Sequence, residues 1–337
     1  MSALGRPIAV SMGEPAGIGC EIILKAWRAR KTDSIPPFFI CGDASLVSQR
    51  GDARSCLSFR TARAAILSLE QTDWQNSPLH VVNVPLAAAV ETGRPNPINA
   101  PGVVGALDAA IEACLAREAS ALVTAPIQKA TLAAAGFAYP GHTEYLAAKT
   151  GANEPMMLLV GGGLKAALVT IHVPLKDVPS LLTVDAIVRK GRILAQGLRA
   201  DFGIARPRIA VAALNPHAGE AGTIGREENL IIVPAVAALA GAGIDARGPF
   251  PADTLFHKGA RAKYDAVLCM YHDQALIPLK TLDFQSSVNV TLALPIVRTS
   301  PDHGTALDIA GKGCADPTSF IAALRLADEI SARRETR

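Results

Sequence analysis

"VVGALDAAIEACLAREASALVTAPIQKATLAAAG", residues 103–136, alternates two kinds of pattern. Apolar residues recur at helical spacing over 103–118, and the short apolar run ALVTAP at 121–126 is typical of a buried strand. A second helical pattern covers 128–136 and stops at Gly136. Helix, strand and helix in this order indicate an α/β fold in which helices cover a largely parallel sheet.

The same alternation runs through most of the chain. Half of the residues are hydrophobic and 4% are aromatic, so the core should be aliphatic, and 337 residues suffice for two domains. Ligands of such sheets bind beyond the carboxyl ends of the strands, which makes the residues after each strand candidates for a site. Further strands are expected at 6–13, 36–43, 164–172 and from 208, and further helices at 20–30, 184–203, 230–244 and 317–335.

Three of the seven histidines follow apolar runs of this kind. ALVTIHVPL carries His172, IAVAALNPHAGE carries His217, and LCMYHDQALIPLK carries His272. If the runs are neighbouring parallel strands, the three imidazoles meet, and such a set suits Zn²⁺ or a similar divalent ion with positions open for substrate oxygens. The spacing alone is a weak signal for a metal site, because no HxxxH pair is present. The alternative is that all three are structural histidines held by hydrogen bonds.

Other polar residues suit an anionic ligand. In PGHTEYL, His142 and Thr143 stand where a helix should begin; they could contact a small anion, or Thr143 could be an ordinary N-cap. In KTLDFQSSVNVTLALPIVRTS, two cations and an amide flank an extended apolar segment, and Arg298 could grip a phosphate or carboxylate through two bonds. The three are Lys280, Asn289 and Arg298.

The Gly-rich turn MGEPAGIG (12–19) permits two interpretations: backbone N–H groups directed at a phosphate, or a tight turn with no ligand.

Several classes of protein find no support in the composition. The net charge of +3 is dispersed, which disfavours nucleic-acid binding. Six cysteines without a CxxC pair indicate reduced, mostly buried thiols in a cytosolic protein. No secretory signal is expected, and the longest uncharged stretch (230–244) is too short to span a membrane. His80 and His257 are interpreted as solvated histidines.

The loop DHGTALDIAGKGCADP (302–317) resembles the adenosine-binding loop of the β-decarboxylating dehydrogenases, isopropylmalate and isocitrate dehydrogenase. Together with GEPAGIG, GHTEYL, TIHVPL, LNPHAGE, PADTLF and MYHDQALIPLK, it makes the chain similar over nearly its full length to the 4-hydroxythreonine-4-phosphate dehydrogenases of vitamin B6 synthesis.

The resemblance implies the isopropylmalate dehydrogenase fold, with two α/β/α domains flanking an active-site cleft. The first domain would hold residues 1–135 and 296–337 with the adenosine loop, and the second residues 136–295 with the dimer interface. The resemblance also implies a cytoplasmic homodimer, in which the two subunits share the active site and the metal.

The resemblance also assigns site residues. His172, His217 and His272 match the ligands of a divalent metal (Zn, Co, Mg or Mn), and the substrate contacts match His142, Thr143, Lys280, Asn289 and Arg298. The cofactor loop would use His303, Gly304, Asp308 and Gly311. NAD is favoured over NADP, because the only basic residue placed for a 2′-phosphate is Lys312.

The implied reaction oxidises 4-phosphohydroxy-L-threonine at C3 and decarboxylates the product to 3-amino-2-oxopropyl phosphate and CO₂. Lys280 is a candidate proton relay, and Asp273 and Asp253 are candidate bases or partners that orient the histidines; either aspartate could instead be a cap or turn residue. Alternatives are oxidation of 4-phospho-D-threonate or D-erythronate, oxidation of an aromatic cis-dihydrodiol, a phosphate acyltransferase on the same fold, and a non-catalytic metal-binding or regulatory protein.

Overall fold

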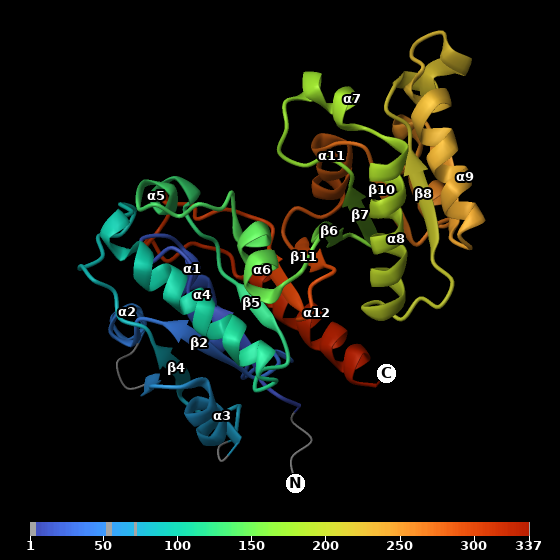
Figure 1. The fold of residues 1–337 in the computed structure, drawn as a ribbon. Coiled ribbons are helices and arrows are strands. Elements are labelled where there is room, and N and C mark those ends of the chain that lie inside the picture. The colour runs from blue at the N-terminus through green and yellow to red at the C-terminus, as the bar shows by residue number, and fades with distance from the viewer. Residues whose placement is uncertain (1–4, 52–55, 71–72, 337) are drawn as a thin grey trace. The chain divides into compact units, whose positions relative to one another are not determined.

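The computed structural model describes residues 5–51, 56–70 and 73–336, and these form two compact units (Figure 1). Unit 1 runs from the first described residue to Pro155 and resumes over Leu294–Glu335. Unit 2 spans Met156–Ala293. Each unit is an α/β structure that contains six of the described strands, and unit 1 is built from both ends of the chain.

The sheet of unit 1 is entirely parallel, in the order β3-β4-β2-β1-β5-β12. Its central strands carry continuous apolar runs that are buried on both faces, as parallel strands covered by helices require. The strands are β1 (Ile8–Ser11), β2 (Phe38–Gly42), β3 (Cys56–Phe59), β4 (Leu79–Asn83), β5 (Leu122–Thr124) and β12 (Arg298–Pro301).

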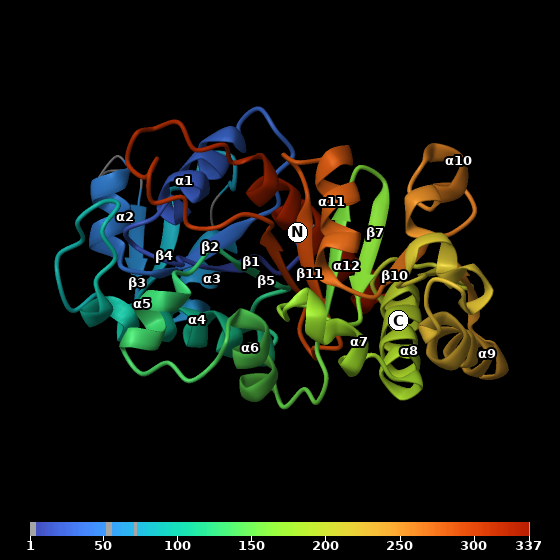
Figure 2. The ribbon, with the colours of Figure 1, turned by 90° about the horizontal axis from the view of Figure 1, so that it is seen from above.

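Helices cover both faces of this sheet (Figure 2). α1 and α12 pack together on one face, while α3 and α4 lie against the other. The helices of unit 1 are α1 (Gly19–Ala29), α2 (Ala44–Arg50), α3 (Ala62–Glu70), the short η2 (Pro97–Asn99), α4 (Ala100–Leu115), α5 (Lys129–Ala134), α6 (His142–Thr150) and α12 (Thr318–Glu335).

The continuous helical segment Pro97–Leu115 is long and apolar enough to cross a membrane by length and composition alone. The sequence-based expectation concerned only the stretch 230–244, which is too short to span a membrane. Leu107, Ala110 and Ile111 of α4 belong to the apolar core of unit 1, so burial within the protein explains the helix's composition. Tyr145 and Leu146 of α6 lie in the same core, although the sequence had placed residues from 136 onward in the second domain.

The sheet of unit 2 is mixed, in the order β11-β6-β7-β10-β8-β9. β7, β10, β8 and β9 are parallel, whereas β6 pairs antiparallel with both of its neighbours. Gly162 and Gly163 connect β6 to β7, both with positive φ, as a two-residue hairpin requires. The strands are β6 (Met156–Gly161), β7 (Leu164–Leu168), β8 (Arg208–Ala212), β9 (Asp245–Phe250), β10 (Ala266–Cys269) and β11 (Val288–Leu292).

In unit 2, α8 and α9 lie on one side of the sheet and α11 on the other (Figure 2). The expected helix over 230–244 is a short π-helical turn, η5, followed by α9, which ends at Gly241. The helical segments are η3 (Leu175–Asp177), α7 (Val178–Leu181), α8 (Val184–Ala200), η4 (Pro216–Gly222), η5 (Glu228–Ile232), α9 (Val233–Gly241), η6 (Ala252–Thr254), α10 (Lys258–Arg261) and α11 (His272–Leu282).

Some side chains lie where the sequence predicted and one does not. All six cysteines are free thiols and four are buried, as expected. His80 is not solvated: it lies on β4 with no exposed surface, its ring stacks on Phe59 at 5.2 Å, and Nδ1 lies 2.8 Å from the carbonyl of Pro78. Burial lowers its pKa, so His80 is a neutral core residue.

Candidate active site

Three neighbouring parallel strands of unit 2 deliver the three predicted metal ligands to one edge of the sheet. The strands lie in the order β7-β10-β8, and their loops carry His172, His272 and His217 respectively. Parallel pairing puts the carboxyl ends of these strands together. The sequence therefore predicted correctly that the three loops share an edge, although β7 ends at Leu168, before the predicted boundary.

Two of the three imidazoles lie together. The ring centroids of His172 and His272 are 5.7 Å apart, and both rings line a cavity of about 280 Å³ with Tyr271 and Asp273. A ring bound to Zn²⁺ has its centroid roughly 3 Å from the ion, so two rings on one ion would lie roughly 5–6 Å apart. The spacing of this pair is therefore compatible with a shared divalent ion.

Asp273 lies 2.7 Å from His272 through Oδ1 and ring atom Nδ1. A carboxylate bound to Nδ1 fixes the ring's orientation and leaves Nε2 for a ligand. This geometry favours the orienting role that the sequence suggested for Asp273. The side chain is two-thirds exposed, so the contact is solvent-screened and weak in energy.

His217 does not join that pair within one chain. Within the described residues, no group of three or more His, Cys, Asp and Glu side chains is gathered to hold a metal ion. His217 is exposed on η4, which packs against η6, the turn that carries the exposed Asp253. The structure thus brings together two predicted ligands and leaves the third on a separate loop.

Buried polar contacts join the three loops, and sequence reasoning missed them. Thr170 donates its hydroxyl to the carbonyl of Met270 at 2.7 Å. Gln274 accepts from the N–H of Met270 at 2.7 Å and donates to the carbonyl of Ala213 at 2.6 Å. The exit of each strand is therefore bonded to the next, which fixes the spacing of the loops that follow. The only sequence signal was the proximity of Thr170 and Gln274 to His172 and His272.

The turn that carries His217 has an unusual backbone. His217, Ala218, Gly219, Glu220 and Ala221 all have φ between 43° and 75°. A left-handed conformation costs L-residues other than glycine about 1–2 kcal/mol each, so surrounding contacts must hold this turn.

Unit 1 contains a buried anion-binding candidate at the end of β5. Arg298 is 3% exposed and donates from Nη2 to the hydroxyl of Thr124 at 2.7 Å. Burial lowers the pKa of Arg298 to about 10, partly offset by the charge of Glu144, and the group stays cationic at neutral pH. Nε2 of His142 is also buried and has no hydrogen-bond partner among the described residues.

His142 is held neutral by its surroundings. Burial comes first among the causes, and the positive charges of Arg298 and Lys129 add to it, so the pKa of His142 lies well below its usual 6.5. A neutral imidazole whose buried ring nitrogen has no described partner can be completed by a hydrogen-bonding ligand. His142 and Arg298 together supply the donor set for a phosphate or carboxylate.

The surroundings of His142 decide whether Thr143 is an N-cap, and they add two residues to the candidate site. Helix α6 begins at His142 with Gly141 as its N-cap, so Thr143 is not the N-cap. Lys129, at the start of α5, contributes charge to His142, and Thr124 contacts Arg298. Both residues lie in ALVTAPIQKA (121–130), at and after the carboxyl end of a predicted strand, where ligands of such sheets bind.

The other predicted substrate residues lie in unit 2. Asn289 is on β11, opposite Leu159 of β6, and its Oδ1 is buried without a hydrogen-bond partner in the described structure. Lys280 is on α11, and its Nζ lies 5.2 Å from the ring centroid of Phe284. It follows His272 by eight residues of the same helix, roughly 12 Å along the axis, so it is not adjacent to the histidine pair.

The loop after β12 carries the predicted cofactor residues. Lys25 of α1 donates to the carbonyls of Gly313 and Ala315, and Glu21 accepts from the N–H of Ala315 at 2.9 Å, which anchors the loop to α1. Nε2 of His303 is buried without a described partner, whereas Gly304, Asp308 and Lys312 are exposed. Gly311 has φ +75°, and a Cβ there would lie 2.7 Å from Thr92.

The MGEPAGIG turn contacts this loop. The N–H of Ile18 donates to the carbonyl of Thr305 at 3.1 Å, and a Cβ on Gly17 would lie 2.9 Å from the same oxygen. The N–H groups of Glu14, Ala16 and Gly17 also bond within the chain. Four donors of the turn are therefore engaged, which favours the tight-turn interpretation over a phosphate cradle.

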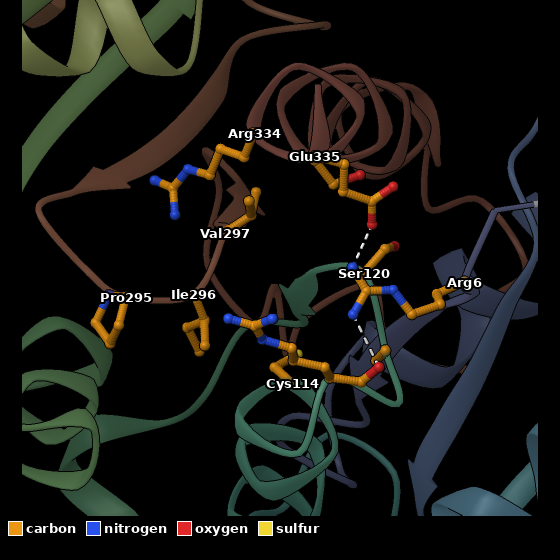
Figure 3. Close-up of a pocket in the computed structure, with 11 residues that line it drawn as sticks. Arg6, Cys114, Ser120, Pro295, Ile296, Val297, Arg334 and Glu335 are labelled. Carbon is orange, nitrogen blue, oxygen red and sulfur yellow. Dashed lines mark hydrogen bonds and ion pairs between the residues drawn. The ribbon is translucent and has the colours of Figure 1, made fainter. Parts of the chain in front are cut away.

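Two other cavities are accounted for by their own contacts. In unit 1, a cavity of about 430 Å³ lies on the amino-terminal side of β1 and β5 (Figure 3). There Arg6 donates to the carbonyl of Arg117, just beyond α4, and pairs with Glu335 at the end of α12. Cations at helix C-termini are stabilising, so structural roles account for this arginine.

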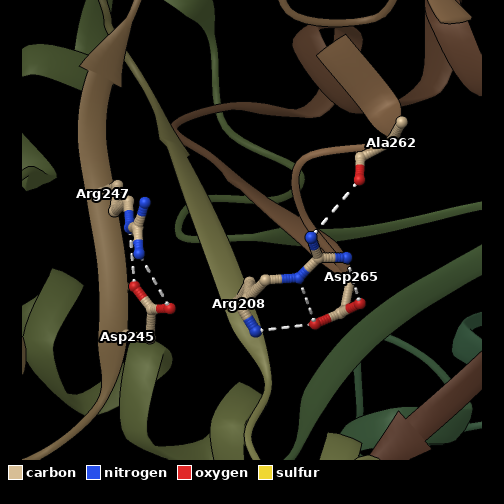
Figure 4. Close-up of polar contacts among 5 residues, drawn as sticks. All are labelled: Arg208, Asp245, Arg247, Ala262 and Asp265. Atoms are coloured by element: carbon tan, nitrogen blue, oxygen red, sulfur yellow. Dashed lines mark hydrogen bonds and ion pairs between the residues drawn. The ribbon is translucent and has the colours of Figure 1, made fainter. Parts of the chain in front are cut away.

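In unit 2, a cavity of about 340 Å³ is lined by Arg208 and Arg247, near the amino-terminal ends of β8 and β9. Figure 4 shows the ion pairs that these two arginines make. Arg208 binds Asp265 through two nitrogens, at 3.2 and 2.9 Å, and Arg247 binds Asp245 at 2.8 Å. The side-chain bond to Arg208 lowers the pKa of Asp265. These arginines are paired with carboxylates, at the edge opposite the histidine loops.

Comparisons with known proteins agree with the resemblance. The family model of the pyridoxal phosphate biosynthetic protein PdxA matches residues 34–327. A 4-hydroxythreonine-4-phosphate dehydrogenase of Caulobacter vibrioides is 54% identical over 335 residues, 98% of each chain. A crystal structure of the same enzyme from Klebsiella pneumoniae is 36% identical, with a TM-score of 0.86 over 97% of this chain and 100% of that one.

A more distant solved structure is a terephthalate 1,2-cis-dihydrodiol dehydrogenase from Burkholderia xenovorans. It is 28% identical, with a TM-score of 0.65 over 96% of this chain and 98% of that one. The names of these relatives and the match of the family model agree with the predicted dehydrogenase fold. The chain is therefore an oxidoreductase and belongs to the family of the pyridoxal phosphate biosynthetic protein PdxA.

Proposed function

We propose that this enzyme oxidises 4-phosphohydroxy-L-threonine at C3 with NAD and a divalent metal, and that the product loses CO₂ to give 3-amino-2-oxopropyl phosphate. The relatives' names support the substrate. The single observation that carries the proposal is the buried Nε2 of neutral His142, which has no described hydrogen-bond partner and lies in the field of the buried cation Arg298, a setting that suits an anionic ligand.

In unit 1, the substrate's anionic groups would be held by Arg298, His142 and Thr143. Arg298, positioned by Thr124, supplies a fixed guanidinium that can make two bonds to a phosphate or carboxylate. His142 supplies a neutral imidazole, and Thr143 a hydroxyl on the first turn of α6. We assign Lys280 and Asn289 as the remaining substrate contacts; the buried Oδ1 of Asn289 is suited to accept from a substrate N–H or O–H.

The metal would be held by His172, His272 and His217. The 5.7 Å spacing of the first pair and the carboxylate on Nδ1 of His272 support a shared ion, and imidazole donors accept Zn²⁺, Co²⁺, Mg²⁺ or Mn²⁺ with different affinities. When bound, a divalent ion supplies Lewis acidity at the substrate oxygen. The chain's contribution is to orient the imidazoles through Asp273 and the bonded strand exits.

The cofactor would bind at the loop after β12, through His303, Gly304, Asp308 and Gly311. The anchoring of this loop to α1 by Lys25 and Glu21 supports a preformed site. NAD supplies the hydride acceptor when bound. Lys312 is exposed and is the candidate contact for a 2′-phosphate if NADP is used instead.

Proton transfer is assigned to this chain's side chains. We propose Lys280 Nζ as the proton relay, with Asp273 and Asp253 as base or orienting groups. The bond of Asp273 to His272 supports orientation for that residue. Asp253 is exposed on η6 beside the His217 turn, where it could contact that imidazole.

We propose a cytoplasmic homodimer with a shared active site. Support comes from large apolar side chains of unit 2 that are exposed on η3, η5 and α11 and just after α11. Ile277 is 63% exposed, Phe284 72%, Leu175 67% and Leu230 68%. Large apolar side chains exposed in this way are typical of an interface.

The main alternative keeps the fold and changes the substrate. The relative from Burkholderia xenovorans acts on a cis-dihydrodiol by name, and phosphorylated threonate or erythronate would present the same phosphate to Arg298. An unphosphorylated diol would leave the Arg298 and His142 pair without an anion.

The test is formation of NADH with 4-phosphohydroxy-L-threonine, 4-phospho-D-threonate and 4-phospho-D-erythronate, before and after chelation and return of metal. We expect preference for the amino acid, loss with chelator and recovery with metal. Preference for a sugar acid would move the enzyme to another pathway. Activity that survives exhaustive chelation would contradict the metal assignment.

Two histidine substitutions sharpen that test. His272→Ala should lose bound metal and turnover while the fold is retained. His257→Ala is the matched control, because His257 is an exposed histidine of the same unit just before α10, away from the strand exits that carry the proposed ligands. Equal metal content in the two variants, measured by atomic emission, would contradict His272 as a ligand.

A further inference from the structure

We infer that Glu228 is the positioning residue that holds the His217 turn in its left-handed form and thereby sets the affinity for the metal. This inference rests on the proposed function, in which His217 is a ligand. Glu228 is the first residue of η5 and is 2% exposed. Its buried side chain contacts the start of the loop between β8 and His217.

The Glu228 carboxylate is surrounded by N–H donors of that loop. Oε1 accepts from the backbone N–H of Leu214 at 2.9 Å and of Asn215 at 2.7 Å, and Oε2 accepts from the side-chain amide of Asn215 at 2.9 Å. In the described part of the chain, N–H groups and no cation meet this buried carboxylate. Bonds of this charge-assisted kind are strong and directional, so they fix the loop just before Pro216 and His217.

The same carboxylate also lies beneath the turn itself. Gly219 has φ +75°, and a Cβ there would lie 2.5 Å from Oε2 of Glu228. The turn approaches the carboxylate so closely that only glycine fits. Glu228 thus contacts the turn on both sides of His217, at residues 214–215 and at residue 219.

This arrangement explains why the strained turn persists. Consecutive left-handed residues would relax if the loop were free, and a strained backbone survives only where its surroundings hold it. The ring of His217 is exposed and makes none of these contacts, so the restraint acts on the backbone that presents it. The geometry is that of a support for a ligand, whose loss typically weakens metal binding by about 10–100-fold.

Glu227→Gln provides a matched control for Glu228→Gln. Glu227 also accepts from the Asn215 side-chain amide, at 2.7 Å, but among its described contacts it does not touch the N–H of Leu214 or Asn215. Glu228→Gln replaces one carboxylate oxygen with an NH₂ group, a donor that would face the N–H donors of Leu214 and Asn215. Glu227→Gln makes the same chemical change one residue earlier in the chain. Gly219→Ala disturbs the same contact from the other side and serves as a second variant.

The experiment measures Co²⁺ binding to the full-length protein by titration calorimetry, with amide hydrogen exchange over 213–224. We expect roughly 10-fold or weaker Co²⁺ binding and faster exchange in Glu228→Gln and Gly219→Ala, and changes within about twofold in Glu227→Gln. The kcat at saturating Co²⁺ should be retained to within a few-fold, which separates positioning from direct catalysis.

The outcomes distinguish this inference from the proposed function. If the wild-type protein binds no Co²⁺, the metal proposal fails and this inference falls with it. If the wild-type protein binds Co²⁺ and both variants bind it equally well, the metal proposal stands and the role of Glu228 is refuted. If Glu228→Gln does not fold, Gly219→Ala decides alone: unchanged affinity in that variant refutes the role.

Discussion

Two arginines of unit 1 are almost equally buried, at 2% and 3% exposure, but their surroundings are opposite in kind. Arg30 donates to the main-chain carbonyls of Trp74, Trp27 and Ser77, and its guanidinium lies 4.0 Å from the ring centroid of Trp27. Arg298 contacts the hydroxyl of Thr124 and shares its electrostatic environment with the imidazole of His142.

The comparison separates structural from functional burial. Main-chain carbonyls satisfy Arg30 within the protein itself, so this cation belongs to the fold. The Arg298 group is instead accompanied by a neutral imidazole whose buried Nε2 lacks a partner in the described chain. Burial alone therefore does not identify a site; the chemistry of the neighbours does.

The strongest way to break the comparison is to remove the guanidinium of Arg298. Arg298→Met should lower kcat/KM for the phosphorylated substrate by on the order of 1,000-fold, about 4 kcal/mol, because two charge-assisted bonds of about 1.5–3 kcal/mol each are lost. Steady-state kinetics measures this. Arg298→Lys should recover part of the loss, since it keeps the charge but not the two-bond geometry.

The prediction holds only if the Arg298→Met protein is folded, and urea unfolding checks this. A kcat/KM within threefold of the wild-type value in folded Arg298→Met would show that Arg298 is a structural cation like Arg30.

The reciprocal change tests the other arginine. Arg30→Met should lower the free energy of unfolding by about 3 kcal/mol, because three buried carbonyls lose their donor and the contact with the Trp27 ring is lost. Urea denaturation measures this loss. The kcat/KM of the folded protein should stay within about twofold; a large kinetic defect at full folding would contradict the structural role.

The fold was largely predictable because its signals are local. Continuous apolar strands and Gly-terminated helices gave the α/β class, and strands β7, β10 and β8 were expected to share an edge before their order was known. The antiparallel β6 was not anticipated, although Gly162 and Gly163 carry the hairpin signal. His80 was misjudged because its neighbours in sequence do not reveal that it stacks on Phe59.

The site was predictable only in part. Residue type and position after apolar runs led to the prediction of His142, His172, His272 and Arg298, which stay predictions as site residues. Thr124, Gln274 and Glu228 were not predicted, because their contacts join segments that are distant in sequence. Glu228, for example, reaches Leu214 fourteen residues earlier. Such contacts depend on how the elements pack, and no local pattern in a single sequence encodes them.

The neutral His142 predicts a pH dependence of stability that Arg298 does not share. Its pKa in the folded state lies well below 6.5, so the unfolded chain binds a proton that the folded chain excludes. The stabilisation is present above pH 6.5 and is lost as the pH falls below it, by up to about 1.4 kcal/mol per pH unit. Urea unfolding between pH 7 and pH 5 measures the slope.

The pKa of the buried His80 is lowered in the same direction, so a single variant must isolate the contribution of His142. His142→Gln should remove part of the slope, and His80→Gln a further part, because the pKa of each imidazole is lowered in the folded state. An unchanged slope in His142→Gln would mean that its imidazole is not held neutral by burial and by the charges of Arg298 and Lys129.

The smallest expected effect concerns the group that positions Arg298. Thr124→Val keeps the shape of the side chain but removes the hydroxyl that accepts from Nη2 at 2.7 Å. The loss should be about 1 kcal/mol, seen as a roughly fivefold rise in KM for the phosphorylated substrate with kcat little changed, because the guanidinium remains but is less fixed. Thr124→Ser, which keeps the hydroxyl, should restore KM. If both variants raise KM equally, the hydroxyl of Thr124 does not position Arg298. The contrast between Arg30, which is held by carbonyls, and Arg298, which is positioned by a hydroxyl, would then be refuted.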